Sequence, residues 1–124
     1  MYDGKQYLCS MTSRMTPLDV ARMLRLRPET AHKGIMGHAL LVAGSAGVGG
    51  WAVLGAESCL RSGVGKLTVC TPECNRLLLQ LSVPEAVLRL LPHGGDDGAS
   101  WEAEEFARRQ AVGIGPGIGL LAVG

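Results

Sequence analysis

Residues 38–50 read HALLVAGSAGVGG, a continuous apolar run that stops in a loop of glycines. An apolar run of this length, from His38 to Ala43, predicts a short strand that is buried on both faces. A helical pattern follows over residues 51–62, with Glu57 and Arg61 four positions apart on its exposed side. Strand, glycine loop and helix in this order predict the first half of a βαβ unit.

The same alternation continues on the C-terminal side of this stretch. Further strands are predicted at residues 67–70, 86–91 and 111–114, and further helices at residues 72–81 and 101–109. Strands that alternate with helices pair in parallel through right-handed crossovers. The predicted fold class is therefore α/β with a parallel sheet.

The N-terminal side divides into two parts. Residues 1–15 are polar and aperiodic, which predicts a linker or a disordered start. Thr16, Pro17 and Asp19 form a helix start, because a threonine caps, a proline fits the first turn and a carboxylate suits the N-terminal dipole. The helix is predicted to reach about Leu26. Its buried stripe is expected to contain Val20, Met23 and Leu24.

Composition excludes several classes of function. The chain has 124 residues, 47% of them apolar, a mean hydropathy of +0.20 and a formal net charge of +1. A charge this small gives no electrostatic basis for binding nucleic acid or an acidic membrane, and no apolar run is long enough to span a bilayer. The four cysteines show no C-x-x-C spacing and no signal peptide precedes them, which favours a reduced, cytoplasmic protein. The histidines likewise lack metal-ligand spacing.

Two glycine turns are the candidate binding elements. The loop at residues 44–50 follows the first strand, and Gly115-Pro116-Gly117-Ile118-Gly119 follows the last. In a parallel sheet both turns lie on the rim where strands end, and backbone N–H groups there can approach a phosphate. A tight turn that binds nothing has the same form. Lys33 beside Gly34 is a second, weaker candidate for phosphate binding.

A Rossmann-type dinucleotide fingerprint is a competing interpretation of the first loop. Gly47, Gly49 and Ala52 fit the G-x-G-x-x-A form, and Glu73 lies 24 positions beyond Gly49, near where a ribose-binding acid belongs. Against this, the first strand ends at Ala43, several residues before the fingerprint begins, whereas a Rossmann strand normally leads directly into its first glycine.

A series of short motifs nevertheless resembles one family. In order along the chain these are His32-Lys33-Gly34, Gly37-His38, Gly44-Ser45, Arg61-Ser62-Gly63-Val64-Gly65, Val83-Pro84-Glu85 and Gly115-Pro116-Gly117. The series is similar to the ADP/ATP-dependent NAD(P)H-hydrate dehydratase domain, which is often fused behind an epimerase domain. The resemblance covers about residues 16–119 and is more specific than any single glycine motif.

This resemblance implies a ribokinase-like, three-layer α/β/α fold and a lyase that repairs hydrated NADH or NADPH. The family uses ATP or ADP with magnesium, phosphorylating the hydroxyl of the hydrate so that it leaves as phosphate. The residues implied to bind the hydrated dinucleotide are Gly47, Gly50, Trp51, Gly115, Gly117 and Gly119. The catalytic aspartate and the nucleotide loops belong to the C-terminal part of the family's domain, so no catalytic or metal-binding residue is assigned here.

The resemblance further implies that residues 16–124 are an N-terminal portion of the domain, inactive alone. A sheet ending at the fourth strand is expected to form a homo-oligomer or to bind a complementary C-terminal segment. The alternatives are a Rossmann-type NAD-binding oxidoreductase and a non-catalytic truncated product. Three residues depart from the family pattern: Trp51 replaces a small alanine, Gly49 a methionine and Lys66 an apolar residue. The indole of Trp51 would either fill the dinucleotide site or pack beneath it, in the space that Gly49 vacates.

Overall fold

The computed structural model describes residues 13–24, 26–91 and 106–119. The chain divides into two compact units, Met1–Thr30 and Ala31–Gly124, and each is described by itself. The first contains one described helix, and the second contains the sheet.

Helix α2 (Pro17–Met23) begins as predicted. The Thr16 hydroxyl accepts a hydrogen bond from the Asp19 N–H at 3.3 Å, and the Asp19 carboxylate accepts one from the Thr16 N–H at 2.9 Å. The predicted extension to Leu26 and the predicted buried stripe are wrong. The helix ends at Met23, none of its residues is buried, and Val20 is 45% exposed. A two-turn helix needs a packed neighbour to bury an apolar stripe, and the described residues of this unit provide none.

The second unit is built on four parallel strands in the order β3-β2-β1-β4. Their bounds are β1 (His38–Val42), β2 (Lys66–Pro72), β3 (Val87–Leu91) and β4 (Ala111–Ile114). The predicted positions of all four strands are confirmed to within a few residues, and β4 matches at both ends. The parallel α/β fold class is therefore confirmed.

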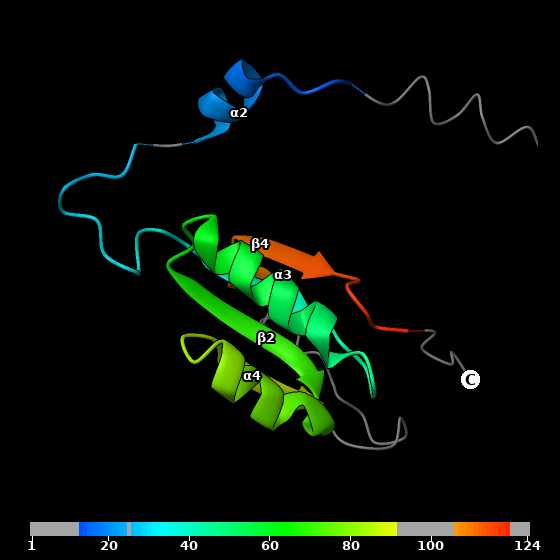
Figure 1. The fold of residues 1–124 in the computed structure, drawn as a ribbon. Coiled ribbons are helices and arrows are strands. Elements are labelled where there is room, and N and C mark those ends of the chain that lie inside the picture. The colour runs from blue at the N-terminus through cyan, green and yellow to red at the C-terminus, as the bar shows by residue number, and fades with distance from the viewer. Residues whose placement is uncertain (1–12, 25, 92–105, 120–124) are drawn as a thin grey trace, which may run out of the picture. The chain divides into compact units, whose positions relative to one another are not determined.

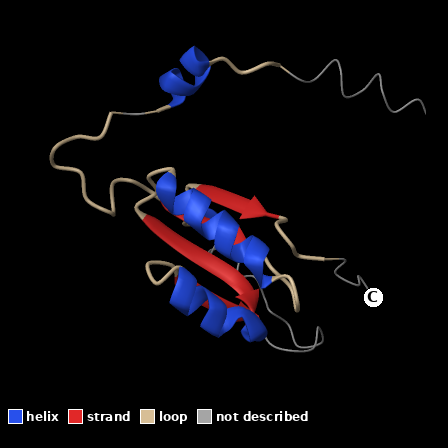
Figure 2. Cartoon of the chain, viewed as in Figure 1, coloured by secondary structure: helices blue, strands red, loops and turns tan. Residues whose placement is uncertain are grey.

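Two helices lie side by side on one face of this sheet, α3 (Gly49–Arg61) and α4 (Arg76–Ser82) (Figures 1 and 2). Helix α3 begins two residues before the predicted Trp51. The helix predicted from Pro72 instead begins with a 3₁₀ turn, η1 (Glu73–Asn75), before α4. The start of the predicted helix at 101–109 lies outside the described residues.

The sheet buries side chains on both faces. On the face covered by α3 and α4, small residues of β1 and α3 allow close packing; the cluster contains Ala39, Leu41, Ala43, Ala52, Ala56, Leu67, Val69, Leu79 and Val83. On the other face, Leu40, Val42 and Cys70 pack with Leu91 and Phe106. Burial on both faces explains why the β1 sequence is apolar without alternation.

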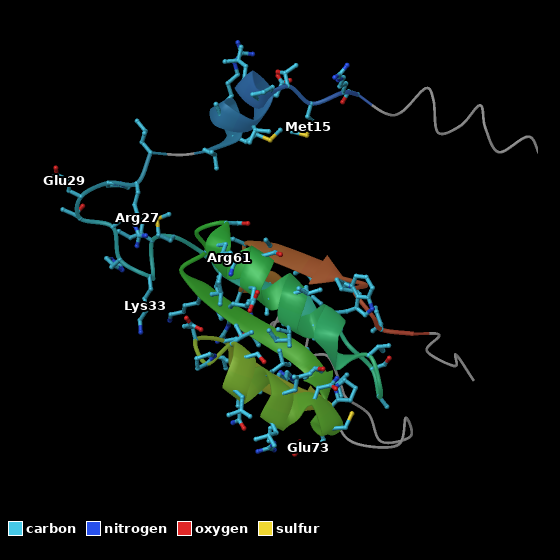
Figure 3. All side chains as sticks on the ribbon, in the orientation of Figure 1. Met15, Arg27, Glu29, Lys33, Arg61 and Glu73 are labelled. Carbon is cyan, nitrogen blue, oxygen red and sulfur yellow. The ribbon has the colours of Figure 1, made fainter. Side chains whose placement is uncertain are left out.

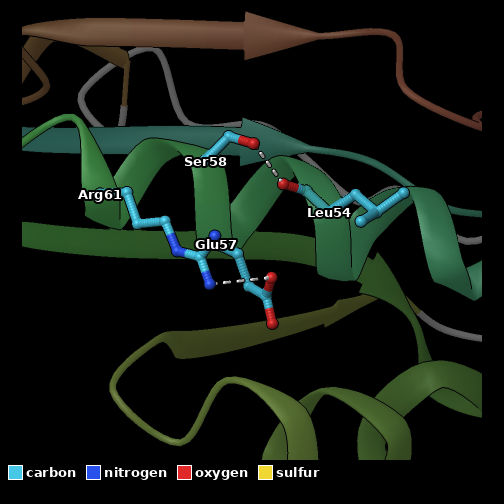
Figure 4. A network of polar contacts seen from close by, with 4 residues as sticks. All are labelled: Leu54, Glu57, Ser58 and Arg61. Atoms are coloured by element: carbon cyan, nitrogen blue, oxygen red, sulfur yellow. Dashed lines mark hydrogen bonds and ion pairs between the residues drawn. The ribbon is translucent and has the colours of Figure 1, made fainter.

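The predicted Glu57–Arg61 pair lies on the outer side of α3, which also carries the exposed side chains of Trp51 and Leu54. Arg61 and Glu57 approach to 3.9 Å, and the Ser58 hydroxyl donates to the Leu54 carbonyl at 2.7 Å (Figure 4). These contacts face solvent and leave the opposite side of the helix to pack on the sheet.

Within residues 13–24, 26–91 and 106–119, no helix combines the length and apolar character needed to cross a membrane.

Candidate functional site

The two glycine turns meet at the carboxyl rim of the sheet, the rim where the parallel strands end. The Gly44 N–H donates to the Pro116 carbonyl at 2.8 Å, and the Gly115 N–H donates to the Val42 carbonyl at 3.2 Å. They meet because β1 and β4 are neighbours, with Val42 paired with Ile114. The predicted placement of both turns on one rim is thus confirmed.

Three of the predicted glycines leave open backbone on this rim. A Cβ placed on Gly47, Gly50 or Gly115 would meet no atom within 4 Å. Gly47 has a φ of 80° and Gly115 a φ of 140°, conformations that a residue with a side chain rarely adopts. At these positions the turns therefore combine tight curvature with an unobstructed backbone.

The remaining predicted residues are Trp51, Gly117 and Gly119, and they lie where the second turn contacts the first loop and the start of α3. A Cβ on Gly117 would lie 2.8 Å from the Trp51 Cβ and 3.0 Å from its Cδ1, so a side chain there would collide with the indole. A Cβ on Gly119 would lie 3.4 Å from the Ser45 Oγ. The residues predicted from the resemblance thus lie in two adjoining turns and at the start of α3.

The position of Trp51 decides whether its indole lies in the predicted dinucleotide site or packs beneath it beside Gly49. The space beside Gly49 is filled by other residues, because a Cβ there would lie 2.5 Å from Asn75 Oδ1 and 2.8 Å from Leu78 Cδ2. Trp51 is 58% exposed instead. The indole therefore does not pack beneath the loop, and it lies on the rim against Gly117.

Helix α3 starts at this rim without a side-chain cap from the described residues. Its N-cap is Val48, and among the described residues no side chain caps it and no acidic residue lies in its first turn. The first N–H groups of a helix have no partner inside it, and the helix dipole makes this end positive. An anionic group is the natural partner for such an end.

Asn75 contacts this loop and was not predicted from the sequence. Its side chain is 5% exposed. Its Nδ2 donates to Thr71 Oγ1 at 2.9 Å and to the Ser45 carbonyl at 3.4 Å. The available signal was an asparagine between the end of a strand and the start of a helix, which ordinarily indicates a cap.

The other two candidate residues, Glu73 and Lys33, lie near opposite ends of β2. Glu73, the acid of the Rossmann interpretation, directly follows β2 and forms an ion pair with Arg76, with N–O distances of 2.7 and 3.0 Å; Figure 3 shows it away from Arg61. The Lys33 carbonyl touches Gly65, immediately before β2 begins, so Lys33 lies at the opposite, amino rim. Lys33, the second candidate for phosphate binding, therefore lies at the opposite end of the sheet from the glycine turns.

Side chains hold the amino rim together. Arg109 Nη1 lies 2.6 Å from His38 Nδ1, and His38 Nε2 lies 2.8 Å from Thr68 Oγ1. Since a guanidinium only donates, Nδ1 accepts and the ring proton is on Nε2, facing Thr68. Burial first, then the charges of Arg109 and Lys66, lower the pKa of His38. The His38 N–H also donates to Gln110 Oε1 at 2.7 Å, which fixes the start of β4.

The chemistry available on the carboxyl rim is binding by backbone and indole. Across the described ranges, no group of three His, Cys, Asp or Glu side chains is placed to hold a metal ion.

Comparison with known proteins identifies the family to which the chain is similar. A profile of the NAD(P)H-hydrate dehydratase family matches residues 39–121, which include both glycine turns. An ADP-dependent (S)-NAD(P)H-hydrate dehydratase from Listeria monocytogenes is 33% identical over 109 residues, 88% of this chain and 38% of the relative. The chain thus spans about two fifths of that relative's length.

Solved structures agree. The ADP/ATP-dependent NAD(P)H-hydrate dehydratase of Bacillus subtilis, co-crystallised with ATP and Mg²⁺, superposes with a TM-score of 0.57 at 39% identity, covering 60% of this chain and 27% of that one. A ribokinase-like superfamily protein from Enterococcus faecalis gives a TM-score of 0.62 at 28% identity, covering 80% and 33%. The predicted ribokinase-like fold is confirmed.

Proposed function

The chain belongs to the NAD(P)H-hydrate dehydratase family, and from that premise we propose that it forms part of the dinucleotide site of an enzyme that dehydrates hydrated NADH or NADPH. The reaction is a lyase reaction that consumes ATP or ADP. It restores the normal reduced cofactor.

The meeting of the two turns is the observation that carries this proposal. The Gly44–Pro116 hydrogen bond joins them within the family match. A hydrated dinucleotide carries a pyrophosphate, and the uncapped start of α3 offers N–H donors to an anion. Gly47, Gly50 and Gly115 leave the backbone open to such a group, and Gly119 completes the second turn beside Ser45.

Trp51 supplies the apolar part of the same site. The indole contacts Gly117 and the residue is more than half exposed, which makes it accessible for stacking on a planar ring of the dinucleotide. Stacking of an aromatic side chain on a base contributes about 1–3 kcal/mol. In this proposal, Trp51 contacts the substrate and does not obstruct the site.

The nucleotide and magnesium belong to another part of the enzyme in this proposal. The B. subtilis relative was crystallised with ATP and Mg²⁺, and the described residues of this chain contain no group suited to a metal. Residues 16–124 are then the N-terminal portion of the dehydratase domain, with residues 1–15 as a linker. The ATP or ADP site and the catalytic carboxylate come from the share of the relatives' length that this chain does not span. Among the described strands β4 lies at an edge of the sheet, which supports pairing with that segment or with a second copy.

Titration of the ¹⁵N-labelled chain with NADPH hydrate tests the binding site. We expect the amide signals of Gly47, Gly50, Gly117 and Gly119 to shift with a common affinity. Trp51→Ala should weaken binding by about 5- to 150-fold, following the stacking energy. Leu54→Ala is the matched control, since Leu54 is also 58% exposed and lies one turn further along α3. Tighter binding by Trp51→Ala would mean that the indole obstructs the site.

Catalysis is tested separately. The chain alone, supplied with NADPH hydrate, Mg²⁺ and ADP or ATP, should not restore the nicotinamide absorbance of NADPH. Turnover by a preparation free of other dehydratase would contradict the proposed location of the nucleotide site.

A further inference from the structure

We infer that Asn75 is a positioning residue for the glycine loop, residues 44–48: its side-chain amide ties this loop to the end of β2 and thereby fixes the start of α3. The consequence for ligand binding rests on the proposed function, whereas the ordering of the loop by Asn75 is independent of it.

The hydrogen bonds of Asn75 join two separate segments. One Nδ2 proton is directed to Thr71 Oγ1 at 2.9 Å, and Nδ2 also lies 3.4 Å from the Ser45 carbonyl. Thr71 is fully buried near the end of β2, whereas Ser45 belongs to the loop after β1. That carbonyl also accepts from the Val48 N–H at 3.1 Å, inside the loop. The amide thus supports the same acceptor that shapes the loop.

Two glycines of this region are fitted around the same amide. A Cβ on Gly44 would lie 3.0 Å from Asn75 Nδ2, and a Cβ on Gly49 would lie 2.5 Å from Asn75 Oδ1. Side chains at either position would therefore displace Asn75. The amide occupies the space beside both glycines, so Asn75 packs against the loop and against the start of α3.

The orientation of Asn75 argues against a purely local role. Asn75 is the N-cap residue of α4, where an asparagine side chain usually accepts a hydrogen bond from the first turn of its own helix. Among the described residues α4 has no side-chain cap bond. The side chain is directed instead to Thr71 and to the loop. Its shorter hydrogen bond goes to Thr71 at the end of β2, and its longer one reaches the Ser45 carbonyl of the loop.

Hydrogen exchange of the full chain tests the inference. The Gly44 and Val48 amides report on the loop, and the Leu41 amide reports on the sheet. We expect Asn75→Leu to speed exchange at Gly44 and Val48 about tenfold relative to Leu41, because the loop loses its side-chain support. Thr71→Val, which removes the hydroxyl acceptor at nearly constant shape, should give a smaller increase at the same two amides. Asn75→Asp keeps the shape and loses the donors, so it should behave like Asn75→Leu.

Ser58→Ala is the matched control, because it removes a hydrogen bond of similar length on the outer side of α3. It should leave the ratio between loop and sheet exchange unchanged. An equal increase at Gly44, Val48 and Leu41 in the Asn75 and Thr71 variants would overturn the inference, since it would indicate only a general loss of stability. If Asn75→Leu does not fold, the same comparison is made with Thr71→Val.

Binding of NADPH hydrate separates this inference from the proposed function. If wild-type chain binds the hydrate, Asn75→Leu should bind it about tenfold more weakly, in proportion to the loss of loop protection. If wild-type chain does not bind it, the proposed function fails, and the exchange ratios still decide whether Asn75 positions the loop.

Discussion

At the carboxyl rim of the sheet, two turns are joined through backbone groups and glycines. At the amino rim, side chains add to the backbone bonds between strand starts: His38 contacts Thr68 and Arg109, and the Gln110 side chain accepts from the His38 N–H. On the carboxyl rim, the buried Asn75 side chain contacts the glycine loop.

This difference suggests that the carboxyl rim receives a ligand and that the amino rim holds the strands in register. A rim that receives a ligand benefits from exposed N–H groups and from the absence of side chains in front of them. A rim that only holds strand starts in register can use side-chain hydrogen bonds. The following substitutions test whether the two rims respond as this contrast requires.

The largest effect is expected between adjacent glycines at the start of α3. Gly49→Ala should destabilise the chain by about 1–3 kcal/mol, because its Cβ would collide with Asn75 and Leu78. Gly50→Ala should be neutral or stabilising by up to about 1 kcal/mol, because its Cβ would enter open space and alanine favours a helix. Urea denaturation of both variants measures the difference, and equal stabilities would contradict the packing described for Asn75.

An intermediate effect is expected at the amino rim as the pH changes. The pKa of His38 is lowered by burial and by the charges of Arg109 and Lys66, so the unfolded chain binds a proton more readily than the folded chain. This contribution to stability should therefore fall as the pH drops below the ordinary histidine value of 6.5. His38→Gln should flatten that part of the curve of unfolding free energy against pH.

NMR titration of the His38 ring checks the cause directly. A folded-state pKa at or above the ordinary value would remove the explanation, even if stability does depend on pH.

The smallest effect is expected on the outer side of α3. Glu57 and Arg61 form an exposed pair at 3.9 Å, and Arg61→Ala should change stability by no more than about 0.5 kcal/mol (Figure 4). Denaturation at low and high salt measures this baseline. A loss larger than that of Gly49→Ala would show that surface charge, and not the packing of the rim, dominates the stability of the unit.

The sequence predicted the sheet well because burial on both faces leaves an unambiguous apolar run, as in β1 and its neighbours. It also predicted that the two turns would meet, since parallel strands end on one rim. It did not predict that Gly49 begins α3, because two adjacent glycines indicate a loop unless a packed neighbour requires them.

Asn75 could not be identified from local pattern. Its contact with Ser45 joins residues 30 positions apart, and its local setting indicates a helix cap. The buried stripe predicted for α2 was wrong for the opposite reason. The apolar spacing of Val20 and Met23 is present, but the described part of its unit provides no layer to bury it.

The place of β4 beside β1 also has a consequence for chain length. Gln110 bonds to His38 across 72 positions, whereas Thr68 reaches the same residue across 30. The entropy of closing a loop grows with the logarithm of its length, so the longer closure costs only about 0.8 kcal/mol more. Long-range pairing of this kind slows folding much more than it reduces stability. Pairing of β4 with β1 therefore costs little in stability despite its long sequence separation, and we expect it to form late in folding.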